Sequence, residues 1–192
     1  MASTDPRSVR SREAILDAAR GLLVEHGPAA VTHVQVADRA GVGRATVYRH
    51  WPQAHDLLSE AMSQVPFPFF DEPTTPVRAW LKRNLEAIAA QLRLVEVRAV
   101  ATTLANGAIW DAGLDARRQA FADAVEGRIA AALTQAAADG EVTLRVDPAS
   151  AAAILLGPAF YRATFEVADV TPDLIEASLD AVGTWTPGCA AH

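Results

Sequence analysis

The stretch GVGRATVYRHW, residues 41–51, collects side chains that can bind phosphate groups and base edges. Within residues 44–50 it holds two arginines, a threonine, a tyrosine and a histidine. A guanidinium donates two parallel hydrogen bonds to a phosphate or a guanine, and hydroxyl groups donate to phosphate oxygens. The stretch contains no carboxylate and no thiol. Its chemistry is suited to recognition of a nucleic acid, and a polar face that is only solvated is the alternative.

Glycines and a proline bound the elements that must position these side chains. Thr32 and Gln35 form a capping-box pattern, and Gly41 is a suitable end for the helix of about two turns that follows. Gly43 is an acceptable N-cap for a second short helix, which Pro52 ends. Two short helices around a three-residue, glycine-bearing turn are typical of a helix-turn-helix motif.

The second of these helices has an inner and an outer face. Val42, Val47 and Trp51 are spaced to face a core, whereas the recognition helix of such a motif presents its remaining residues to base edges and phosphates. The outward residues are Arg44, Ala45, Thr46, Tyr48 and His50. By charge pattern alone, a merely solvated polar face remains the alternative.

The rest of the chain is predicted to be all-α. Residues 8–28 form an amphipathic helix with Ile15, Ala19, Leu22 and Leu23 on its apolar stripe, and Pro52 lies near the start of a fourth helix. We expect an N-terminal domain, 1–60, whose residues 1–11 form a basic or disordered arm, and a helical domain, 61–192. The further helices are expected in residues 77–93, 94–107, 111–140, 147–167 and 171–185.

Charge and composition restrict the class of protein. Seven arginines balance seven acidic residues in 1–60, so the whole net charge of −6 belongs to 61–192. Residues 1–60 form a neutral, arginine-bearing head, and such a head can still bind DNA through one face. The single cysteine, Cys189, rules out an internal disulfide framework, and neither a signal pattern nor a membrane span is visible. We expect a cytoplasmic protein with no membrane association.

The sequence does not predict an enzyme. GVG lacks the preceding strand and the third glycine of a dinucleotide loop. His26 and His33 are seven residues apart and His50 and His55 five, so neither pair stacks on one helical turn to hold a metal. We expect no catalytic residue, no metal and no cofactor.

The segment from about Arg12 to Leu58 resembles the DNA-binding domain of the TetR family of bacterial transcriptional regulators. The resemblance is carried by ILDAARGLLVEHG and VTHVQVADRAGVGRATVYRHWPQAHDLL. It implies an N-terminal three-helix helix-turn-helix domain and a C-terminal helical domain that binds a ligand and dimerises. The implied function is a repressor that binds a palindromic operator in double-stranded DNA as a homodimer and is released by a small lipophilic effector.

The resemblance also assigns residues to the DNA contact. Arg44 matches a position that can read guanine, Ala45 one that can meet a thymine methyl, and Arg49 is equally suited to phosphate or to solvent. The implied DNA-binding residues are Thr32, His33, Arg44, Ala45, Thr46, Tyr48, Arg49 and His50. Gly43 replaces a serine and Ala54 a lysine of the family, with His55 a weak substitute. A helical interaction module that has lost DNA binding is therefore the alternative.

The resemblance implies two further sets of residues, one for an effector cavity and one for a dimer interface. The aromatic residues that would line an effector cavity, or else belong to an ordinary core, are Trp80, Trp110, Phe121, Phe160, Tyr161 and Phe165. The last two helices would form a four-helix bundle with a second subunit, although a monomer core is the alternative. Their implied interface residues are Ala151, Ile154, Leu155, Pro158, Arg162, Leu174, Ser178, Leu179 and Val182.

Overall fold

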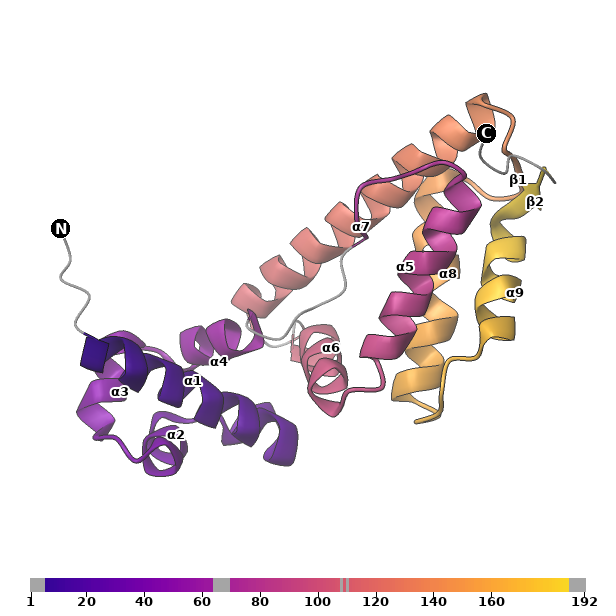
Figure 1. Ribbon diagram of the computed structural model, residues 1–192. Coiled ribbons are helices and arrows are strands. Elements are labelled where there is room, and N and C mark those ends of the chain that lie inside the picture. The colour runs from indigo at the N-terminus through magenta and orange to yellow at the C-terminus, as the bar shows by residue number, and fades with distance from the viewer. Residues whose placement is uncertain (1–5, 64–69, 108, 110, 187–192) are drawn as a thin grey trace, which may run out of the picture. The chain divides into compact units, whose positions relative to one another are not determined.

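The structure is a computed structural model that describes residues 6–63, 70–107, 109 and 111–186. The helices of these ranges are α1 (Pro6–His26), the 3-10 turn η1 (Pro28–Ala30), α2 (His33–Ala40), α3 (Arg44–His50), α4 (Ala54–Ser63), α5 (Val77–Gln91), α6 (Val95–Gly107), α7 (Ala112–Ala138), α8 (Pro148–Thr164) and α9 (Pro172–Val182) (Figure 1). The predicted helical fold class is confirmed. None of the described helices has the length and apolar character needed to cross a membrane.

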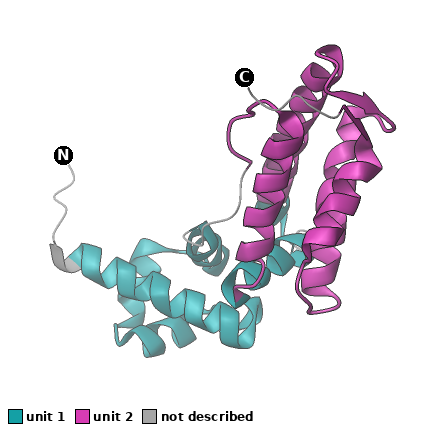
Figure 2. Ribbon diagram, turned by 45° about the vertical axis from the view of Figure 1, so that its right-hand side comes forward, with its two compact units in different colours: residues 1–66, 95–116 teal, residues 67–94, 117–192 magenta. Residues whose placement is uncertain are grey.

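The chain divides into two compact units (Figure 2). Unit 1 comprises residues 1–66 and 95–116, and unit 2 comprises residues 67–94 and 117–192. Helix α6 therefore groups with the N-terminal helices, whereas the sequence led us to expect one boundary near residue 60. The apolar pattern of α6 identifies a buried face but not the helix that covers it.

Unit 1 is built around α1. Helices α2, α4 and α6 all pack against it, and the predicted stripe of Ile15, Ala19, Leu22 and Leu23 is buried. The expected arm is partly a continuation of this helix, because α1 already begins at Pro6. Residues 1–5 of the arm lie outside the described residues.

The predicted helix ends of the helix-turn-helix motif are confirmed. The Thr32 hydroxyl oxygen accepts a hydrogen bond from the backbone N–H of Gln35 at 3.2 Å. Gly41 ends α2 in the left-handed region with φ of 66°, where glycine is unstrained. Gly43 is the N-cap of α3 and Trp51 its C-cap. Helix α4 begins at Ala54, slightly later than Pro52.

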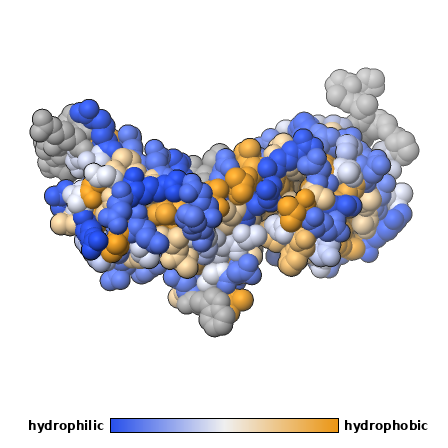
Figure 3. Space-filling model, turned by 90° about the horizontal axis from the view of Figure 1, so that it is seen from below, coloured by the Kyte–Doolittle hydropathy of each residue, from blue (hydrophilic) through white to orange (hydrophobic). Residues whose placement is uncertain are grey.

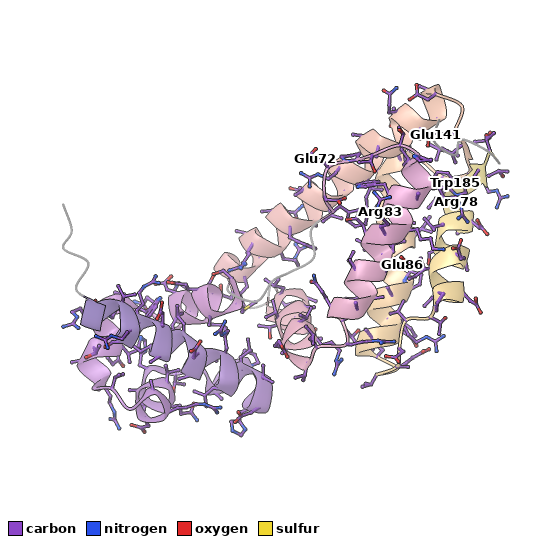
Figure 4. The ribbon with its side chains drawn as sticks, in the orientation of Figure 1. Glu72, Arg78, Arg83, Glu86, Glu141 and Trp185 are labelled. Atoms are coloured by element: carbon purple, nitrogen blue, oxygen red, sulfur yellow. The ribbon has the colours of Figure 1, made fainter. Side chains whose placement is uncertain are left out.

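In unit 2, α8 packs against α9 and both pack against α5. Strands β1 (Val142–Leu144) and β2 (Gly183–Trp185) pair antiparallel and join the end of α9 to the segment after α7. The sequence predicted helix up to Trp185. Gly183 explains the difference, because a Cβ there would lie 2.8 Å from the backbone oxygen of Thr143 and prevent this approach. Figure 4 shows Glu141 and Trp185 at this end of the unit.

Candidate nucleic-acid interface

Helix α3 separates its buried and exposed residues as the sequence predicted, except at His50, which is half-buried. Val47 and Trp51 are buried, with exposed fractions of 0% and 3%, and Val42 is half-buried. The exposed residues of the helix are Arg44, Ala45, Tyr48 and Arg49, and Thr46 is half-exposed. The surface of unit 1 that is visible in Figure 3 is predominantly hydrophilic. The apolar anchor of α3 thus leaves a polar face in solvent.

The arginines of this face differ from other arginines of the head. Arg12 pairs with Glu60, Arg20 with Asp17, and Arg39 with Glu25. Neither the Arg44 side chain nor the Arg49 side chain has an ion pair or hydrogen bond to any residue that the structure describes. Their charges are therefore not neutralised by neighbouring carboxylates and remain available to an anionic partner.

The ion pair of Arg39 fixes α2 against α1. Its guanidinium donates to both carboxylate oxygens of Glu25, at 2.5 and 2.7 Å. The hydrogen bond from Arg39 lowers the pKa of the Glu25 carboxyl, and the same pair raises the pKa of Arg39. A two-bond contact holds both side chains in one geometry and so orients the first helix of the motif.

A second contact fixes the C-terminal end of α3. The indole Nε1 of Trp51 donates to the carboxylate of Glu60 in α4 at 2.8 Å. Arg12 of α1 pairs with the same carboxylate, and its guanidinium carbon lies 5.3 Å from the Trp51 ring centroid. Arg12 therefore belongs to the framework that holds α1, α3 and α4 together.

His33 and Thr32 lie at the start of α2. The His33 ring is buried, its Nε2 atom is 2.7 Å from the carbonyl oxygen of Trp51, and its face stacks on Tyr48. The Thr32 hydroxyl donates to Oε1 of Gln35 at 3.1 Å. Both side chains serve contacts within unit 1, so a phosphate would meet the backbone N–H groups here. Helix α2 has no acidic residue in its first turn, which favours an anion.

His50 is poorly placed for the DNA contact that the resemblance implied. Its ring is half-buried and lies against Trp51, with ring centroids 5.5 Å apart. The Nε2 atom is buried and finds no hydrogen-bond partner among the described residues. Packing against the C-cap tryptophan turns this nitrogen away from solvent, a consequence that helical spacing alone does not reveal.

The aromatic residues predicted for an effector site have different environments in unit 2. Trp80 is fully buried, packs on Phe70 and donates from Nε1 to Asp71 at 2.6 Å. Phe121 and Phe160 are half-buried. Tyr161 and Phe165 are exposed and stack on each other with centroids 5.4 Å apart. Trp110 lies outside the described residues.

The residues predicted for a dimer interface also fall into two groups. Five are buried within the single chain, where α8 meets its neighbours, and their side chains are already covered: Ala151, Leu155, Ser178, Leu179 and Val182. Four are half-exposed: Ile154, Pro158, Arg162 and Leu174. The sequence identified helices with a strong apolar face, and the structure shows that this face is directed into unit 2 itself.

The fold and the site define a helix-turn-helix transcriptional regulator, a class of DNA-binding protein that is not enzymatic. Residues 15–61 match the family described as bacterial regulatory proteins, tetR family. Residues 72–182 match the tetracyclin repressor-like C-terminal domain. The second match alone covers more than half of the chain. The chain therefore belongs to the TetR family, as the sequence motifs implied.

Individual relatives agree with this assignment. The chain is 39% identical over 84 residues to the transcriptional repressor LfrR of Mycolicibacterium smegmatis, a match that covers 41% of this chain and 43% of LfrR. The matches thus span less than half of such curated relatives. Among solved structures, NalD, the secondary repressor of the MexAB-OprM multidrug efflux pump in Pseudomonas aeruginosa, superposes with a TM-score of 0.73 at 23% identity, over 93% of this chain and 98% of NalD. SmeT, the repressor of the multidrug efflux pump SmeDEF of Stenotrophomonas maltophilia, superposes with a TM-score of 0.71 at 24% identity. This match covers 94% of this chain and 96% of SmeT.

Proposed function

We propose that this protein represses transcription by binding a palindromic operator as a homodimer, and that a small lipophilic effector releases it. The observation that carries the DNA-binding part is the pair of exposed arginines on α3, Arg44 and Arg49, which have no carboxylate partner among the described residues. Other arginines of the head have such partners. A bacterial regulator of transcription acts in the cytoplasm, where the chromosome lies.

Each exposed residue of α3 suits a particular contact. Arg44, at the first turn of the helix, donates to the O6 and N7 atoms of a guanine, and the Ala45 methyl packs on a thymine methyl. The Tyr48 hydroxyl, which bonds to no described residue, and the Arg49 guanidinium donate to phosphates. Thr46 lies at the edge of this surface. The N–H groups at the start of α2 receive one more phosphate.

Dimerisation is best supported by a surface stripe of α8. Every fourth residue of the helix is exposed and uncharged: Ala149, Ala153, Gly157, Tyr161 and Phe165. Such a continuous stripe, small at one end and aromatic at the other, lets a second helix approach closely and bury two rings. This contact would be bordered by the half-exposed Ile154, Pro158, Arg162 and Leu174. We therefore assign Tyr161 and Phe165 to the dimer interface and no longer to the effector site.

A dimer gives the DNA contact its specificity. One short helix reads few base pairs, whereas two helices related by a two-fold axis read two half-sites about 34–36 Å apart. The four residues of α3 that face bases and phosphates then make the same contacts at both half-sites.

Binding of a small molecule, the first step of such a release, is supported by one relative. The structure of a SmeT–triclosan complex resembles this chain with a TM-score of 0.68 at 23% identity. In unit 2 of the present chain, the buried side-chain Oε1 atom of Gln91 has no hydrogen-bond partner among described residues, so a ligand donor could satisfy it. The half-buried Phe121 and Phe160 are the remaining aromatic candidates. Triclosan and similar lipophilic compounds are the first to try in a thermal-shift assay with Gln91→Leu as control.

The proposal is tested by selecting bound sequences from random duplex DNA. The wild-type protein should enrich an inverted repeat, and the double variant Arg44→Ala with Tyr48→Ala should enrich none. Arg20→Ala is the matched control, because Arg20 pairs with Asp17 in α1. If the wild-type protein enriches no sequence at moderate salt, the DNA-binding function is rejected in favour of an interaction module.

A further inference from the structure

We infer that His33 is a positioning residue that orients Tyr48 for its contact with DNA. This inference rests on the proposed function. It assigns to His33 an indirect role, because the side chain lies beneath the interface and does not reach its surface.

The two rings form a close parallel stack. Their centroids are 4.0 Å apart and their planes differ by 11°. His33 is 7% exposed, whereas Tyr48 is 50% exposed. One face of the phenol ring is therefore covered by imidazole while the rest of the side chain is in solvent. A tyrosine without this support would exchange between rotamers at the surface of a short helix.

A hydrogen bond holds the imidazole in place. Nε2 of His33 is 2.7 Å from the carbonyl oxygen of Trp51. Because a carbonyl only accepts, Nε2 must carry the proton of this bond. Trp51 is itself fixed, since its indole donates to Glu60 and its ring lies under Arg12. His33 thus joins the start of α2 to both the outer face and the C-terminal end of α3.

This arrangement orders Tyr48 before DNA arrives. A flexible side chain loses rotamer freedom when it binds, and that loss weakens the complex. A side chain that is already stacked loses less. Removing the stack should therefore weaken operator binding about 3–10-fold, although no side-chain atom of His33 needs to touch the operator.

Two variants separate the ring of His33 from its hydrogen bond. His33→Phe keeps a flat ring for the stack and loses the donor. His33→Gln keeps a donor for the Trp51 carbonyl and loses the ring. Operator affinity should be closer to wild type in His33→Phe than in His33→Gln, whichever of the two is less stable to heat. The reverse order of affinities would overturn the inference.

A double-mutant cycle decides whether His33 acts through Tyr48. Operator affinity is measured for wild type, His33→Gln, Tyr48→Ala and the double variant, at a temperature where thermal melts show all four to be folded. His33→Gln should cost about 3–10-fold in the presence of Tyr48 and almost nothing in Tyr48→Ala. An equal cost in both backgrounds overturns the inference alone. A wild-type protein that binds no operator overturns the proposed function as well.

Discussion

The buried carboxylate of Glu141 accepts a hydrogen bond from the backbone N–H of Val77, with 2.7 Å between Oε2 and the nitrogen. Val77 is the first residue of α5, and its N-cap, Pro76, offers no side-chain hydrogen bond. The first N–H groups of a helix lack partners within it, and the helix dipole favours a negative charge there. Glu141, from the turn after α7, thus caps a helix 64 residues away in sequence.

Replacing Glu141 should destabilise unit 2. Glu141→Ala leaves a buried N–H without an acceptor, and we expect the free energy of unfolding to fall by about 2 kcal/mol. Glu141→Gln retains an acceptor and should lose less. Urea unfolding followed by circular dichroism measures both, with the exposed Glu126→Ala of α7 as control. Equal stabilities for Glu141→Ala and Glu126→Ala would contradict the cap.

The salt dependence of DNA binding distinguishes the two interpretations of Arg49. If its guanidinium contacts a phosphate, Arg49→Ala should reduce the slope of log K against log salt by about 0.9 per subunit. If the side chain is only solvated, the slope should not change. Fluorescence anisotropy with a labelled operator at several salt concentrations gives the slope. Arg20→Ala should retain the wild-type slope, because Asp17 already pairs with that arginine.

Two exposed glycines test the dimer surface. Gly157 lies in the stripe of α8 and Gly127 in α7, and a Cβ at either would meet no atom within 4 Å in the single chain. Gly157→Gln should therefore dissociate the dimer while leaving the fold intact, and Gly127→Gln should leave the dimer unchanged. Sedimentation velocity over a range of protein concentrations measures both. Two variants that remain dimeric would exclude this face.

The ion pairs between α5 and α9 predict a loss of stability in acid. Glu176 accepts hydrogen bonds from Lys82 at 2.6 Å and from Arg78 at 2.8 Å, and mainly the bond from Lys82 lowers its pKa. A lowered pKa in the folded state stabilises the protein above the unfolded pKa, about 4.3, and this stabilisation disappears as the pH falls through the folded value. Wild type should exceed Glu176→Gln in stability at pH 7 but not at pH 2.5.

The same comparison with Asp173→Asn provides the control. Asp173 is exposed in the first turn of α9. Asp173→Asn should therefore lose as much stability between pH 7 and pH 2.5 as the wild-type protein does. Urea unfolding at the two pH values would contradict the assignment if Glu176→Gln kept its full deficit in acid.

Local chemistry made the head predictable from sequence. Thr32, Gly41 and Gly43 set the helix ends of the motif through their own backbone preferences, and Val47 and Trp51 followed from helical spacing. Each of these signals involves residues within a few positions of one another. For that reason the exposed face of α3 was predicted from the sequence except at His50, whose Nε2 atom is buried.

Contacts between distant residues were not predictable in this way. The stack of His33 on Tyr48 and the pairing of Val142 with Trp185 depend on how helices pack. The apolar periodicity of α8 located a buried face, but it could not distinguish Leu155, covered within the chain, from an interface residue. At its N-terminal end, the exposed stripe through Gly157 has small residues, whose low hydrophobicity gives little signal.

Gly43 offers a test of the cap that the family usually supplies with serine. Its φ and ψ of −67° and 139° are those of an ordinary N-cap, and a Cβ would meet only the Thr46 hydroxyl oxygen, at 4.0 Å. In Gly43→Ser the new hydroxyl can accept from an N–H of the first turn of α3, which should raise stability by a few tenths of a kcal/mol. Gly43→Ala adds the same Cβ without an acceptor and should lower it, because alanine is a poorer N-cap than glycine. Thermal melts of the two variants should therefore shift in opposite directions, and a shift in the same direction would show that the backbone rather than the cap controls this helix end.

Operator affinity should follow the same order, since the serine hydroxyl also adds a donor at the exposed start of the recognition helix.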